Sequence, residues 1–161
     1  GGFLTFEKNL SGGPNKIERL SVKKPVEIVL ASTGITQETK VVVGDVRAKK
    51  EADEAWFEKV SKEYLETYEE GLKAIKKEDW ETVGKMMDRN QELLLEIGVS
   101  CDEIEEIIKI GKENGAIGAK LTGTGRGGYV LLLTPGEEVQ EKVAVAIEAK
   151  NYPIVKTKIG V

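Results

Sequence analysis

The chain contains 161 residues, of which 40% are hydrophobic and 32% are charged, and its formal net charge is −4. These proportions are typical of a soluble globular domain, and no apolar run is long enough for a membrane span or a signal peptide. We therefore expect a cytoplasmic protein without a membrane partner. The single cysteine, Cys101, excludes an internal disulfide. The lack of histidine excludes a histidine base and argues against the common zinc, copper and iron sites, so no metal ligands are predicted.

Charge is unevenly distributed along the chain. Residues 45–113 carry 20 acidic and 12 basic side chains, a net −8, whereas the remaining residues carry 8 acidic and 12 basic side chains, a net +4. The positive part includes a glycine-rich stretch at residues 118–130. Nucleic-acid binding would need a denser basic face with aromatic side chains, and only Tyr129 lies near this stretch. The distribution favours a small anionic ligand over nucleic acid.

The first part of the chain is predicted to be β-structure. Residues 1–6 have the pattern of a strand with no leader before it, so we expect Gly1 to be a cut within a longer polypeptide. The next predicted elements are a turn at residues 11–15, a short strand at residues 17–20 and a clearer strand at residues 26–30.

Apolar residues then recur at spacings of three and four, which predicts amphipathic helices. The predicted helices cover residues 37–50, 56–75, 80–97 and 101–113. We expect Thr36 and Ser100 to be the N-caps of the first and fourth helices. The third helix is expected to be capped by Asp79 or the preceding Glu78 and to end at Gly98. The aromatic stripe of the second helix is interpreted as core, because such periodicity marks a buried face.

Asn90 is the one amide on the apolar stripe of the third predicted helix, between Met87 and Leu94. A buried amide without hydrogen-bond partners costs a few kcal/mol, so it must find partners. We predict that Asn90 is a structural brace to a neighbouring element, with a ligand-facing amide as the alternative.

The remaining elements are strands at residues 117–121 and 129–133, a helix ending near Ala149 and a strand at residues 152–158. Thr134 is the expected N-cap of this last helix, with Pro135 at its first position and Glu137 at its third. The order of elements predicts one α+β domain over residues 1–161. Its antiparallel sheet is expected to be covered by a layer of helices mainly on one face.

The glycine-rich stretch lies between two predicted strands. Its central glycines are Gly123, Gly125, Gly127 and Gly128. Without Cβ atoms, successive N–H groups can converge on one point, and such a concavity binds anions such as phosphate. The alternative is a tight hairpin, which needs only one or two glycines. We therefore predict an anion-binding loop.

Several known loops share part of this pattern but do not fit. The stretch satisfies G-x-G-x-x-G, yet a dinucleotide-binding fold requires the loop to open a helix, and residues 129–133 continue as a strand. With Val130 included, the stretch also matches the glycine-rich phosphate loop of protein kinases. That interpretation fails because the chain has no histidine for the catalytic H-R-D motif and no D-F-G motif. No Gly-Lys-Ser or Gly-Lys-Thr follows, which excludes a Walker A loop.

Three stretches together resemble the superfamily of galactokinase, homoserine kinase, mevalonate kinase and phosphomevalonate kinase. Residues 118–129 resemble its third, C-terminal glycine motif, and within the superfamily they are most similar to the mevalonate kinases. Residues 32–47 resemble the segment after the substrate-domain strand, and residues 87–100 resemble a helix-and-turn signature. The resemblance covers most of the chain and implies the C-terminal domain of this kinase fold, with ferredoxin-like elements.

The chain also departs from the family pattern. The family usually has alanine at Thr124, glycine at Arg126 and cysteine at Tyr129, and often histidine at Cys101. Thr124 and Arg126 add bulk where a backbone approaches phosphate. For Arg126 the alternative is a charge-assisted contact to phosphate.

The resemblance implies a phosphate- or substrate-binding set, with Mg²⁺ and ATP as cofactors. The residues in this set are Lys120, Thr122, Gly123, Thr124, Gly125, Arg126, Gly127, Gly128 and Thr39. Plain helix capping is an equal alternative for Thr39. No catalytic residue is expected in this chain, since the family's catalytic aspartate and its lysine or glutamate partner belong to the N-terminal half.

The implied protein is therefore the C-terminal half of an ATP-dependent kinase that converts mevalonate to 5-phosphomevalonate. This chain alone is expected to be inactive, and its partners would be ATP, the substrate and the N-terminal half. Surface left bare by a missing half would favour association, so a homodimer is also expected. Homoserine or phosphomevalonate kinases, and a non-catalytic binding or assembly module with the same fold, are the alternatives.

Overall fold

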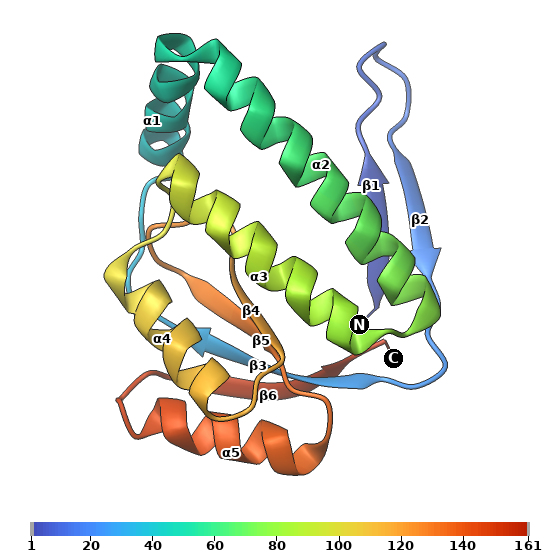
Figure 1. Cartoon of the computed structure of the whole chain (residues 1–161), viewed down its shortest axis with the longest axis vertical. Helices are drawn as coiled ribbons and strands as arrows, with labels where there is room; N and C mark the ends of the chain where they lie inside the picture. Colours follow the sequence, from blue (N-terminus) through green and yellow to red (C-terminus); the bar gives the residue numbers. More distant parts are fainter. Residues whose placement is uncertain (1, 161) are drawn as a thin grey trace.

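The structure is a computed structural model that describes residues 2–160 and has its elements in the predicted order (Figure 1). The expectation about Gly1 lies outside the described residues. The elements are β1 (Phe3–Glu7), β2 (Lys16–Leu20), β3 (Val26–Ser32), α1 (Thr39–Ala52), α2 (Glu54–Lys77), α3 (Trp80–Ile97), α4 (Asp102–Glu113), β4 (Gly118–Thr122), β5 (Tyr129–Leu133), α5 (Glu137–Glu148) and β6 (Ile154–Ile159).

The main sheet has four antiparallel strands in the order β4-β5-β3-β6. Because side chains alternate along each strand, Val29 and Ala31 of β3 point to the same face as Val130 and Leu132 of β5. Helices α4 and α5 cover that face and supply much of the larger core, including Ile107, and Val42 of α1 and Leu121 of β4 add to it. The α+β prediction with an antiparallel sheet is thereby confirmed.

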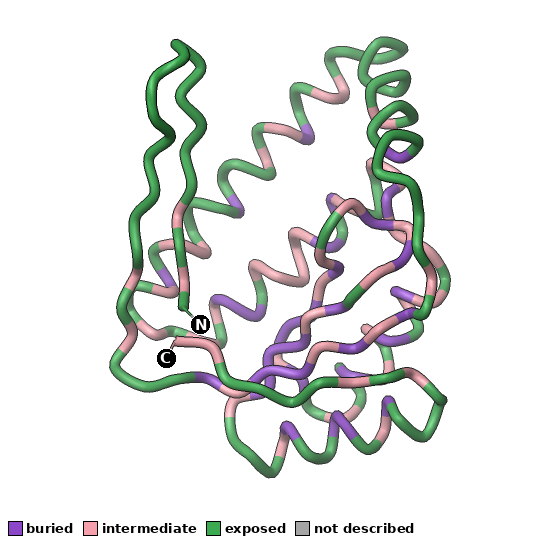
Figure 2. The backbone as a smooth tube through the Cα atoms, turned by 180° about the vertical axis from the view of Figure 1, so that it is seen from behind, coloured by how far each residue is buried: buried purple, intermediate pink, exposed green. Residues whose placement is uncertain are grey.

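The opposite face of the sheet is covered mainly at one end. Val26, Ile28 and Leu133 pack there against Ala74 of α2 and Val83 of α3. Figure 2 shows the buried segments concentrated in the main sheet and the helix faces turned toward it, while the β1–β2 hairpin is almost wholly exposed.

The hairpin formed by β1 and β2 is a separate two-stranded sheet that stands beside α2 (Figure 1). Its apolar side chains Leu4, Phe6 and Ile17 are 60 to 62% exposed, and Leu10 in its connecting segment is 90% exposed. A contiguous apolar surface of this kind is uncommon on a monomeric protein.

Two helix starts differ from the prediction. The N-cap of α1 is Glu38 and not Thr36, and that of α4 is Cys101 and not Ser100; neither makes a side-chain capping bond. The Ser100 hydroxyl is instead bonded to Gln91 and Glu105, so a buried contact outweighs the local cap. By contrast, Asp79 caps α3 and Gly98 ends it as predicted.

The start of α5 also differs from the prediction. Its N-cap is Gly136, because Thr134 is fully buried and its hydroxyl donates to the carbonyl of Glu27 at 3.2 Å. The carboxylate of Glu27 accepts from the Gly136 N–H at 2.9 Å and pairs with Lys158 at 3.0 Å. A side chain from β3 thus caps α5 from a distance, which no local sequence pattern shows.

Helix α3 lies along β4, the edge strand of the main sheet. A Cβ added to Gly84 would come within 2.4 Å of the Ile117 carbonyl oxygen, so only glycine allows this approach. Asp88 then accepts from the Ala119 N–H and Gln91 from the Leu121 N–H, both at 2.9 Å. The helix side chains therefore satisfy the outward amides of the edge strand.

Within residues 2–160, none of the helices combines the length and the apolar character that crossing a bilayer requires.

The capping role of Glu27 gives a testable prediction. The Gly136 N–H, with Lys158 beside it, holds the pKa of Glu27 below its ordinary value. We expect Glu27→Gln to lower the free energy of unfolding at pH 7 by about 1 kcal/mol, the scale of a lost charge-assisted hydrogen bond. Because the folded pKa is depressed, this contribution is present above the unfolded pKa and is lost as pH falls below about 4.

Urea unfolding at pH 7 and pH 3 measures this effect. The matched control is Glu138→Gln, an exposed glutamate in the first turn of the same helix. The capping role of Glu27 is contradicted if Glu27→Gln lowers the free energy of unfolding equally at both pH values. It is also contradicted if the loss is no larger than that of the control.

Candidate anion-binding loop

The glycine loop connects β4 to β5 and is fixed to two neighbouring segments. The Arg126 N–H donates to the Val99 carbonyl at 2.7 Å, and the Gly128 N–H donates to the Ile35 carbonyl at 2.9 Å. Val99 lies just after α3, and Ile35 lies in the loop before α1. These two anchors set the path of the loop from opposite sides.

Two glycines are required by close approaches to these anchors. A Cβ on Gly125 would lie 2.1 Å from the Val99 carbonyl oxygen, and one on Gly127 would lie 2.6 Å from the Ile35 carbonyl oxygen. Both residues also have positive φ angles, of 93° and 144°. Any side chain at these positions would push the loop off its supports.

The loop presents backbone donors that the protein itself does not use. For the N–H groups of Gly123, Thr124, Gly125 and Gly127, no acceptor is found in the described part of the chain. These residues line a hollow of about 280 Å³, together with residues 35–37 and the ends of β4 and β5. Unpaired N–H groups gathered at one hollow are suited to an anion.

The start of α1 adjoins this hollow. Thr39 is the first residue of α1, and its hydroxyl oxygen lies 3.1 Å from that of Thr124. The Glu38 carbonyl accepts from Val41 and Val42, and no acceptor for the N–H groups of Thr39 and Lys40 is found within residues 2–160. A helix N-terminus adds positive potential to the same region.

The structure therefore brings together most of the residues predicted from the sequence. Thr122, Thr124, Thr39 and the loop glycines lie around one hollow or at its edge. The Thr122 hydroxyl donates to the Tyr129 carbonyl at 3.1 Å, which closes the neck of the loop. Two of the predicted residues, Arg126 and Lys120, are placed differently.

The side chain of Arg126 is held by protein acceptors. Its Nε donates to the Gly98 carbonyl at 3.0 Å, and its Nη1 forms an ion pair with Asp45 of α1. The structure thus gives the guanidinium a position different from the phosphate contact considered from the sequence. Asp45 was not predicted as part of the site, since it lies 81 residues from Arg126 in the sequence.

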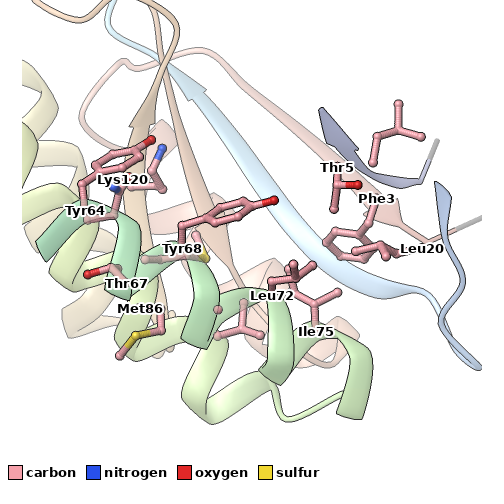
Figure 3. Close-up of a pocket in the computed structure, with 15 residues that line it drawn as sticks. Phe3, Thr5, Leu20, Tyr64, Thr67, Tyr68, Leu72, Ile75, Met86 and Lys120 are labelled. Carbon is pink, nitrogen blue, oxygen red and sulfur yellow. The ribbon is translucent and has the colours of Figure 1, made fainter. Parts of the chain in front are cut away.

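Lys120 lines a second cavity, of about 270 Å³, between the β1–β2 hairpin, α2 and α3 (Figure 3). Its walls are mostly apolar and aromatic, and they include Phe3, Tyr64 and Tyr68. The Lys120 ammonium donates to the Leu121 carbonyl at 2.8 Å, and burial lowers its pKa. Lys120 therefore does not line the hollow of the glycine loop.

Asn90 also lines this second cavity, and no hydrogen bond of its side chain is found among the described residues. The bracing role predicted for Asn90 belongs to its neighbour Gln91. The Gln91 amide donates to Ser100 at 3.1 Å and to Glu105 at 2.8 Å, and its oxygen accepts from the Leu121 N–H. The sequence signal that could have identified this brace is the spacing of Gly84, Asp88 and Gln91, which places all three on one face of α3.

Comparison with known families adds to this geometry. The family model described as GHMP kinases C terminal matches residues 72–154, which is more than half of the chain. This chain belongs to the GHMP kinase family. The matched region includes α3, α4 and the complete glycine loop, and it ends at the beginning of β6.

The most similar relatives include mevalonate kinases of archaea. That of Thermococcus sibiricus is 33% identical over 166 residues, covering 99% of this chain and 47% of the relative. That of Pyrococcus horikoshii is 35% identical over 161 residues, covering 96% of this chain and 45% of the relative. This GHMP kinase chain thus spans about half the length of the curated relatives it matches.

A solved structure agrees with this relationship. The crystal structure of L. major mevalonate kinase in complex with R-mevalonate superimposes with a TM-score of 0.92 at 28% identity. The superposition covers 98% of this chain and 49% of the other. The fold of this GHMP kinase chain therefore matches one half of that enzyme.

The reassigned brace can be tested by paired substitutions. Gln91→Leu leaves the buried Leu121 N–H without an acceptor, and we expect it to lower the free energy of unfolding by about 2 to 3 kcal/mol. Asn90→Leu is the matched control. It should lower the free energy of unfolding by less than about 1 kcal/mol, because the Asn90 side chain lines a mostly apolar cavity. Urea unfolding measures both, and an equal or larger loss for Asn90→Leu would overturn the reassignment.

Proposed function

We propose that this chain is the C-terminal domain of an ATP-dependent kinase that phosphorylates mevalonate. The reaction is transfer of the ATP γ-phosphoryl group to the primary hydroxyl of mevalonate, giving 5-phosphomevalonate and ADP. We place it in the cytoplasm, in isoprenoid biosynthesis. Membership of the GHMP kinase family and the similarity to mevalonate kinases support this proposal.

The observation that carries the proposal is the set of four loop N–H groups, beside the start of α1, that have no acceptor within residues 2–160. Phosphoryl transfer depends mainly on positioning and on stabilising negative charge on phosphate oxygens. The loop is held in place where Gly125 and Gly127 lie against neighbouring carbonyl groups. Its backbone N–H groups can therefore stabilise this charge with little rearrangement of the loop. The amides of Gly123, Thr124, Gly125 and Gly127 are therefore proposed to hold the phosphate region of the nucleotide or product.

The remaining predicted residues take secondary roles in this proposal. The hydroxyl of Thr39, already within 3.1 Å of Thr124, would lie near the transferred group or the substrate hydroxyl. Thr122 lies at the neck of the loop, and Lys120 offers a cation in the second cavity for an anionic part of the substrate. We treat these side chains as orienting groups, since each already bonds within the protein.

We further propose that the catalytic aspartate, its lysine or glutamate partner and most contacts to ATP and Mg²⁺ lie on a separate N-terminal half. The chain spans about half of its relatives, which supports this division. The exposed apolar side chains of the β1–β2 hairpin offer a surface against which another domain can pack. Without that half, the same surface favours a homodimer.

The direct test is ADP release in a coupled assay. The chain alone should show none. A fusion that places it after the N-terminal half of the Thermococcus sibiricus relative should release ADP with mevalonate, and much less with homoserine or phosphomevalonate. The same fusion with Gly125→Val should be inactive, because the new side chain collides with the Val99 carbonyl.

Three outcomes contradict the proposal. Turnover by the isolated chain would show that the division between halves is wrong. Mevalonate or nucleotide binding without turnover by a folded fusion would instead favour the non-catalytic binding module. Preference for another alcohol in the substrate panel would move the enzyme elsewhere within the superfamily.

A further inference from the structure

Two residues fasten the glycine loop to α1. Arg126 pairs with Asp45, and Thr124 lies within hydrogen-bond distance of Thr39. Asp45 and Thr39 both belong to α1, so the two links join the loop to the same helix.

The backbone conformation of Arg126 indicates that its side-chain contacts help to hold the loop. Its φ angle is 54°, a left-handed conformation that disfavours residues with a Cβ and suits glycine. An arginine at such a position is stable only where its contacts compensate. Here its N–H, its Nε and its Nη1 bind the Val99 carbonyl, the Gly98 carbonyl and Asp45.

These contacts join three parts of the molecule. Val99 and Gly98 belong to the turn between α3 and α4, and Asp45 lies on the second turn of α1. Arg126 thus ties the centre of the loop to the turn after α3 and to α1, while Thr124, which lines the hollow, contacts Thr39 at the start of α1. The carboxylate of Asp45 offsets the guanidinium charge, which leaves the backbone N–H groups as the donors for an anion.

We propose that Arg126 and Thr124 form a clasp that holds the glycine loop in its anion-binding shape before a ligand arrives. In this role Arg126 is a positioning residue and does not contact phosphate. The identity of the ligand, a phosphoanhydride, rests on the proposed function. A loop ordered in advance loses less conformational freedom on binding, which increases affinity.

The decisive experiment compares two substitutions by calorimetric titration of this chain with inorganic pyrophosphate. Asp45→Asn releases Arg126 from its partner. If Arg126 positions the loop, this variant should bind pyrophosphate about three- to tenfold more weakly, the scale of one lost charge-assisted contact. If Arg126 is a phosphate ligand, or if only the overall charge matters, the same variant should bind more tightly.

The matched control is Glu51→Gln, which removes a negative charge from the exposed end of the same helix. It should leave the affinity within about twofold of the original, since a distant exposed charge is screened by salt. Tighter binding by Asp45→Asn, or an equal change in both variants, overturns the clasp.

A second readout does not depend on ligand binding. Arg126→Gly is compatible with the backbone angle and removes only the side chain. We expect it to lower the ¹⁵N heteronuclear NOE of the loop amides in the free protein, with a smaller decrease in Thr124→Ala. Unchanged values in Arg126→Gly would contradict the clasp, whereas no pyrophosphate binding by any variant would contradict the proposed function alone.

Discussion

The outward N–H groups of the edge strand β4 impose the constraint on which the site depends. A buried amide without an acceptor is costly, and β4 has no further strand on that side within residues 2–160. Helix α3 supplies the acceptors, Asp88 and Gln91, from two positions three residues apart. These bonds require a close approach of helix and strand, which Gly84 permits against the Ile117 carbonyl.

This packing determines where the glycine loop lies. With α3 fixed along β4, the turn after the helix lies beside the end of the strand, and the Val99 carbonyl accepts the Arg126 N–H. Ile35 anchors the other side, and the start of α1 closes the hollow through Thr39. The shape of the anion site therefore follows from a structural requirement of the sheet, and the glycines allow the loop to fit between its two supports.

Sequence patterns predicted the elements and the loop because both rest on local features, namely apolar periodicity and glycine content. The errors concern long-range partners. Periodicity placed Asn90 on a buried stripe but could not show that Gln91, on the neighbouring face, meets the edge of a sheet. Thr134 and Ser100 had the chemistry of N-caps, yet the Thr134 hydroxyl donates to the carbonyl of Glu27, 107 residues away, and the Ser100 hydroxyl donates to the Glu105 side chain of α4. The partner of Arg126 is likewise far away in the sequence.

The central claim is that the backbone amides of this loop bind phosphate oxygens. The most direct measurement is an amide-resolved NMR titration of the ¹⁵N-labelled chain with inorganic pyrophosphate at constant ionic strength. We expect the largest shifts at the amides of Gly123, Thr124, Gly125 and Gly127, with a smaller shift at Thr39. Shifts concentrated around the cavity of Lys120, or no change at the loop up to millimolar pyrophosphate, would contradict the claim.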